Sequence, residues 1–83
     1  MQTVTVFTDK IMGMLKSMVV LTMQVSFRQG ATISEICGFL RDWAPDAADS
    51  YHEGIVERVL VDLHHEGRVA QAGARWYLNG NRA

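Results

Sequence analysis

The sequence predicts a small α+β domain in which three helices precede a C-terminal β-hairpin. Three observations in its second half predict this fold class. Apolar residues recur at helical spacing over 55–63, so they fall on one side of a helix. Gly67 then provides a stop, because a glycine just after a helix adopts the left-handed conformation at little steric cost. Two short β-like runs follow on either side of Ala72–Ala74, a glycine-centred connection that suits a tight hairpin.

The size and composition of the chain indicate one globular domain over residues 1–83. Hydrophobic residues make up 48% of the chain and charged residues 20%, which is typical of a folded protein. The single Cys37 excludes a disulfide within one chain and favours a reducing cytoplasm. The N-terminus shows no signal peptide, and the apolar stretch 11–27 is shorter than the roughly 20 residues that span a bilayer. We therefore expect no membrane partner.

The N-terminal residues alternate threonine and valine over 2–7, which predicts a short strand or an ordered arm across residues 1–8. A frayed terminus is the alternative. Thr8 is then expected to cap the first helix, since Asp9 would lie favourably in its first turn.

The first helix is expected from about Asp9 to Arg28 and is apolar nearly all round. Such a helix must be covered on more than one side. Either a second copy or another partner covers the far side, or the arm and the hairpin of the same chain do so. For the first case we name Val20 and Met23 as interface residues of a homodimer through this helix. Residues 18–27 are rich in β-branched side chains, so a strand is the alternative there.

The second and third helices are both predicted to begin at a capping box. Thr32 and Glu35 form the first, and Ser50 and Glu53 form the second. The second helix ends before Pro45, because the residue before a proline avoids the helical region. We expect a core of Ile36, Leu40, Ile55, Val59, Leu60, Leu63, Val69 and Trp76.

The third helix and the hairpin resemble the second half of a winged helix-turn-helix domain. The segment Leu63–Val69, LHHEGRV, has an apolar-x-x-x-Gly-x-Val pattern, and Trp76–Leu78 supplies an aromatic-rich return strand. The resemblance covers about 31–78 and implies that Tyr51–Glu66 is the recognition helix and Arg68–Leu78 the wing. Strands over 68–71 and 75–78 would form this wing. A polar tail, 79–83, is expected to be mobile.

Enzymatic chemistry has little support in this sequence, because it lacks a phosphate-binding glycine loop and a nucleophile elbow. The adjacent His64 and His65 diverge by about 100° around a helix and cannot clasp one ion. Cys37 lies on the apolar face of the second helix, where a small buried hydrophobe is its expected role. We expect no catalytic residue, metal, cofactor or small-molecule substrate.

The charge distribution leaves two functions open. The resemblance implies a DNA-binding regulator of bacterial or phage type, with Arg58, Arg68 and Arg75 contacting double-stranded DNA. Yet residues 31–66 hold two cationic and eight anionic side chains, a net charge of −6, whereas the rest of the chain carries six cations and one anion, or +5. An acidic helix-turn-helix segment is poorly suited to approach phosphates.

The alternative is a protein-interaction module, such as a phage-type inhibitor or adaptor, on the same fold. The outward face of the third helix would then bind a protein through Gly54, Glu57, Val61 and His65. Val61 is the apolar centre of that face, and Glu57 would repel a DNA backbone.

Overall fold

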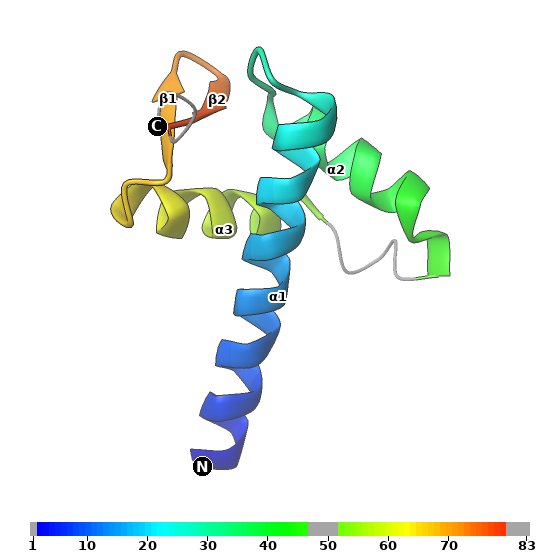
Figure 1. Ribbon diagram of the computed structural model, residues 1–83. Coiled ribbons are helices and arrows are strands. Elements are labelled where there is room, and N and C mark those ends of the chain that lie inside the picture. Colours follow the sequence, from blue (N-terminus) through cyan, green and yellow to red (C-terminus); the bar gives the residue numbers. More distant parts are fainter. Residues whose placement is uncertain (1, 47–51, 80–83) are drawn as a thin grey trace.

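The computed structural model describes residues 2–46 and 52–79, with side chains from Lys10 onward. Three helices precede a two-stranded antiparallel sheet (Figure 1). Their bounds are α1 Gln2–Ser26, α2 Ile33–Trp43, α3 Glu53–His65, β1 Val69–Ala72 and β2 Arg75–Leu78. This α+β, winged-helix-like layout confirms the predicted fold class.

Helix α1 begins at Gln2, so the strand or arm expected over residues 1–8 and the cap expected at Thr8 are wrong. A lone strand would need a neighbour to satisfy its backbone groups, whereas a helix bonds its own backbone. In the described structure the sheet consists of β1 and β2, and residues 2–7 belong to α1. The strand considered for residues 18–27 is also absent, because α1 continues to Ser26.

Helix α2 begins at the predicted capping box. The Glu35 N–H donates to Thr32 Oγ1 at 3.1 Å, and the Thr32 N–H donates to Glu35 Oε1 at 2.9 Å. Both first-turn donors are thereby satisfied by side chains. The helix ends at Trp43, two residues before Pro45, as the sequence indicated.

Helix α3 begins later than predicted and is capped by a different side chain. His52 is the N-cap, and its Nδ1 accepts a hydrogen bond from the Ile55 N–H at 3.3 Å. Ser50, the expected cap, lies outside the described residues. At the other end Gly67 has φ +77° and the Arg68 N–H donates to the Leu63 carbonyl at 2.9 Å, which confirms the predicted glycine stop.

The hairpin follows at once and is tied back to the link between α1 and α2. Val69 pairs with Leu78 and Ala72 with Arg75, which leaves Gly73 and Ala74 as a two-residue turn. The link contributes Ala31, which exchanges two backbone hydrogen bonds with Trp76 at 2.8 and 3.0 Å.

Asn79 is the first residue of the tail that was expected to be mobile, and it is held in place. Its N–H donates to the Arg68 carbonyl at 3.0 Å, and its Nδ2 donates to the Gly67 carbonyl at 3.1 Å. Residues 80–83, the remainder of that tail, lie outside the described structure.

One hydrophobic core joins all five elements. Of the eight residues predicted for it, Ile55 is half-buried at its edge and seven are buried. The seven are Ile36, Leu40, Val59, Leu60, Leu63, Val69 and Trp76. Helix α1 adds Leu15, Val19 and Met23, so the core occupies its C-terminal half while its N-terminal half extends beyond the other elements (Figure 1).

Candidate functional site

The outward face of α3 is the first candidate site. The buried stripe of α3 faces the core, so the opposite side of the helix faces solvent. The exposed residues on that side are Gly54, Glu57, Arg58, Val61 and His65. Val61 is 37% exposed and is the one large hydrophobic residue of α3 that solvent reaches to this extent. The face that sequence periodicity assigned to solvent is therefore confirmed.

Each arginine predicted to contact DNA is already paired with a carboxylate of its own chain. Arg58 Nε lies 3.7 Å from an Asp62 oxygen one helical turn away. On the hairpin side, an Arg68 NH1 group lies 3.5 Å from Glu66 Oε1, just across the glycine stop.

Arg75 is held by two groups at once. Its NH1 donates to the Gly30 carbonyl at 3.2 Å and lies 3.4 Å from Glu35 Oε1. That same oxygen belongs to the capping box of α2, so the hairpin arginine is anchored at the start of α2. Only half of the Arg75 side chain is exposed.

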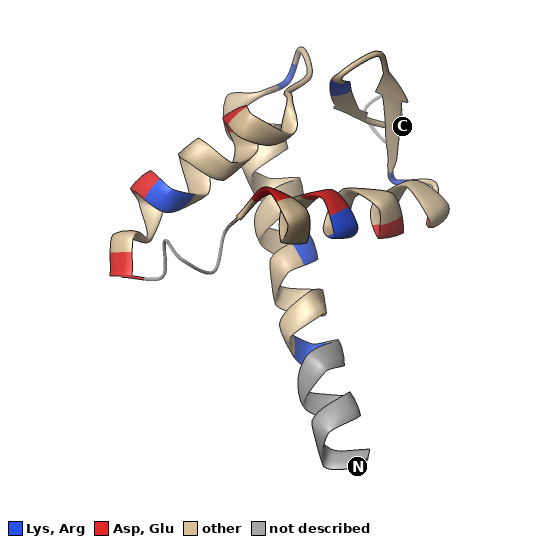
Figure 2. Ribbon diagram, turned by 180° about the vertical axis from the view of Figure 1, so that it is seen from behind, with Lys and Arg blue, Asp and Glu red and all other residues tan. Residues whose placement is uncertain are grey.

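These pairs lower the positive charge that the arginines present to a polyanion. A phosphate would have to compete with a carboxylate already 3.4–3.7 Å from each guanidinium. Figure 2 shows acidic segments along α3 on either side of its single arginine. The three arginines are thus spread over α3, the glycine stop and β2 and do not form a free basic stripe.

Glu66 connects the end of α3 to α1. It accepts a hydrogen bond from Lys16 Nζ in an ion pair that spans 50 residues of sequence. This bond is the largest cause that lowers the pKa of the Glu66 carboxyl below its usual value. Lys16, one of the cations outside the acidic segment, is therefore neutralised within the fold.

Of the two dimer residues named from the sequence, Met23 is wrong. Met23 is fully buried in the core and cannot contact another molecule. Val20 is half-buried and packs against the same core. Periodicity showed that α1 is apolar nearly all round, but it could not show which side α2 and α3 cover.

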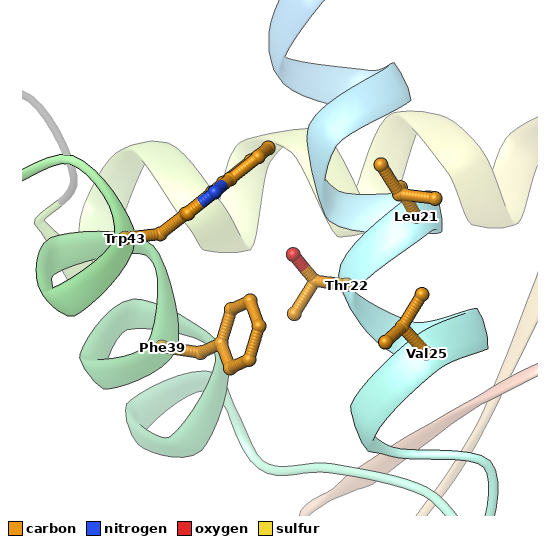
Figure 3. A pocket seen from close by; sticks show the side chains of 5 residues that line it. All are labelled: Leu21, Thr22, Val25, Phe39 and Trp43. Carbon is orange, nitrogen blue, oxygen red and sulfur yellow. The ribbon is translucent and has the colours of Figure 1, made fainter.

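A second apolar surface lies between α1 and α2 and was missed in the sequence. Figure 3 shows Leu21 and Val25 of α1 facing Phe39 and Trp43 of α2, with Thr22 between them. They line a cavity of about 180 Å³. Trp43, in the last turn of α2, is 55% exposed. Its position at the end of α2 was the only sequence signal for this surface.

Other kinds of site find no support in the described part of the chain. No three His, Cys, Asp or Glu residues described there could hold a metal ion together. None of the helices that the structure describes has both the length and the apolar character that crossing a membrane requires. Cys37 is buried, and burial raises the pKa of its thiol, so it lacks the thiolate character of a nucleophile.

Comparisons of this chain with protein-family models, with curated proteins and with solved structures found no match.

Proposed function

We propose that this chain is a protein-interaction module that binds a protein partner through the outward face of α3. The observation that carries the proposal is the pairing of Arg58, Arg68 and Arg75 with carboxylates of the same chain. A winged-helix layout usually docks its third helix on DNA, where Lys and Arg contacts with phosphates supply much of the affinity. Here each of the three guanidinium groups already lies 3.4–3.7 Å from a carboxylate, which lowers the net positive charge that it presents to phosphates.

The composition of the α3 face also favours a protein partner. Val61 provides an exposed apolar centre, and Glu57, Arg58 and His65 provide a polar surround. An apolar centre with a polar rim is the usual organisation of a protein–protein interface. A free, buried Cys37 supports placing this interaction in the reducing cytoplasm.

DNA binding by a regulator of bacterial or phage type is the second candidate. One observation favours it: the Arg58 side chain is 72% exposed on the α3 face. A single arginine can read a guanine edge, worth about 1–3 kcal/mol of discrimination. Three phosphate contacts from Arg58, Arg68 and Arg75 would give a salt dependence with a slope of roughly −3.

A fluorescence-anisotropy titration against random-sequence duplex at low ionic strength separates the two candidates. We expect no binding at tens of micromolar protein. Binding that weakens with salt at a slope of roughly −3, and that Arg58→Ala or Arg75→Ala reduces, would contradict the protein-interaction proposal.

The protein-interaction proposal also predicts which substitution abolishes partner binding. Val61→Glu places a charge at the centre of the α3 face and should abolish capture of the partner from an extract of the source cells. The matched control is Gln71→Glu, which adds the same negative charge at an exposed position of β1. It should leave capture of the partner intact. Equal capture by the wild-type and Val61→Glu proteins would exclude the α3 face as the binding surface.

A further inference from the structure

Exposed apolar residues form a continuous seam along α1. Ile11, Met14, Leu21 and Val25 are 39%, 64%, 48% and 68% exposed. The half-buried Met18 completes a series with alternating steps of three and four residues. This is the spacing of the a and d positions of a heptad repeat, by which one helix packs along another. We call these five residues the α1 seam.

The fold leaves the α1 seam open on one side. Leu15, Val19, Thr22 and Met23 point into the core, and at about 100° per residue the seam lies beside that buried face. Helix α1 has 25 residues, so it is about 37 Å long. The α1 seam runs from Ile11 to Val25, about 21 Å of this helix, so a partner helix could run along this stretch.

The cavity between α1 and α2 widens the α1 seam at its C-terminal end. Leu21 and Val25 belong to both, and Phe39 and Trp43 add aromatic surface on the α2 side (Figure 3). Thr22 is 2% exposed, and its hydroxyl has no hydrogen-bond partner among the described residues. An exposed tryptophan beside an unfilled apolar cavity is the kind of anchor point that dominates the energy of protein interfaces.

The edges of the α1 seam suit contact with an identical surface. In the heptad that the seam defines, the e positions Leu15 and Thr22 are buried within the same chain. The free edge therefore consists of the g positions among the described side chains, Lys10, Ser17 and Gln24. Lys10 is the only charged member of that set. A two-fold dimer brings the same patch of both subunits together, so a charged edge would repel its copy. An almost neutral edge avoids this repulsion.

We propose that the α1 seam is the dimer interface of this protein, occupied by α1 of a second copy. Helices that carry heptad seams pack along one another, and a second copy supplies such a helix by symmetry. The interface is separate from the α3 face, and it replaces the Val20 and Met23 surface expected from the sequence. Two domains joined in this way would present two α3 faces.

Sedimentation velocity of the purified chain over a micromolar concentration series tests the dimer. We expect a species of twice the 9.3 kDa chain mass that dissociates on dilution. Met14→Glu and Val25→Glu should each raise the dimer dissociation constant at least tenfold, because each places a charge in the α1 seam. Both residues are more than 60% exposed in the single chain, so helix content measured by circular dichroism should not change.

Val61→Glu is the matched control, because it makes the same kind of change at an exposed hydrophobic residue outside the α1 seam. It should leave the dimer intact while abolishing partner capture. A wild-type chain that stays monomeric at the highest concentration, or a folded Met14→Glu/Val25→Glu double variant that stays dimeric, would overturn the dimer proposal. Neither result would bear on the α3 face, which the capture assay examines separately.

Discussion

Single residues in this protein often serve two neighbours, and Glu35 illustrates this best. Its carboxylate accepts the Thr32 N–H in the capping box and also lies near Arg75 of the hairpin. Gly30 is similarly constrained: it has φ +97°, and a Cβ at this position would overlap the ring of Tyr77. The start of α2 and the hairpin are therefore held together by a few atoms around residues 30–35.

The Lys16–Glu66 pair predicts a pH-dependent contribution to stability. The hydrogen bond from Lys16 lowers the pKa of Glu66 in the folded chain. A carboxyl whose pKa is lower in the folded than in the unfolded state contributes stability above its unfolded pKa, and this contribution is lost as the pH falls through the folded value. Glu66→Gln should therefore lower the free energy of unfolding at neutral pH and have a vanishing effect at pH values below the ordinary carboxyl range.

Urea unfolding of the wild-type and Glu66→Gln proteins at a series of pH values measures this difference. Glu57→Gln is the control, because Glu57 is exposed on the same helix and makes no ion pair among the described residues. A Glu66→Gln effect that stayed constant through the acidic range would show that Lys16 does not stabilise the carboxylate.

At the scale of elements, helix faces were easier to predict than helix ends. The apolar spacing of α3 assigned its buried stripe, and Thr32 with Glu35 assigned the start of α2. The start of α3 was missed because His52 caps it, and histidine is not among the preferred N-cap residues. The start of α1 was missed because alternating threonine and valine favour a strand locally, whereas in the structure these residues continue the helix that follows them.

The buried stripe of α3 predicts a large effect for Leu60→Ala. Leu60 is fully buried where α3 meets the rest of the core, so its removal should cost about 2–5 kcal/mol of unfolding free energy. Val61→Ala, one residue along on the exposed face, should change stability by no more than about 0.5 kcal/mol. Urea denaturation of both variants checks the assignment, and a smaller loss for Leu60→Ala than for Val61→Ala would refute it.

At the scale of the whole molecule, the sequence predicted the layout but not how charges pair. Arg75 and Glu35 are 40 residues apart, and Lys16 and Glu66 are 50 apart, so only the fold shows that they meet. The same holds for the cavity between α1 and α2, which depends on how the two helices diverge at Trp43. The sequence alone showed that residues 31–66 are acidic, whereas the tertiary contacts determine which arginines can still bind a partner.

The single core predicts a single unfolding transition. Trp76 is 4% exposed in the core, whereas Trp43 is largely exposed, so Trp43→Phe leaves Trp76 as a selective fluorescent reporter of the hairpin. Its transition should coincide with the loss of helix measured by circular dichroism, as two-state unfolding requires. If the hairpin signal were lost at lower denaturant concentration than the helix signal, the hairpin would be a separate cooperative unit.

The division of α3 into a buried stripe and an outward face also has a practical consequence. Gly54, Glu57, Arg58, Val61 and His65 are exposed and contribute no side chain to the core. Substitutions at exposed positions away from caps and special backbone conformations usually change stability little. Glu57, Arg58, Val61 and His65 could therefore be randomised together in a display library, with Val56, Val59, Leu60 and Leu63 kept constant to preserve the scaffold. Gly54 is also kept, because a Cβ there would lie 3.3 Å from Nδ1 of the His52 cap. A chain of 83 residues without disulfides would then be a compact starting point for selecting new binding proteins.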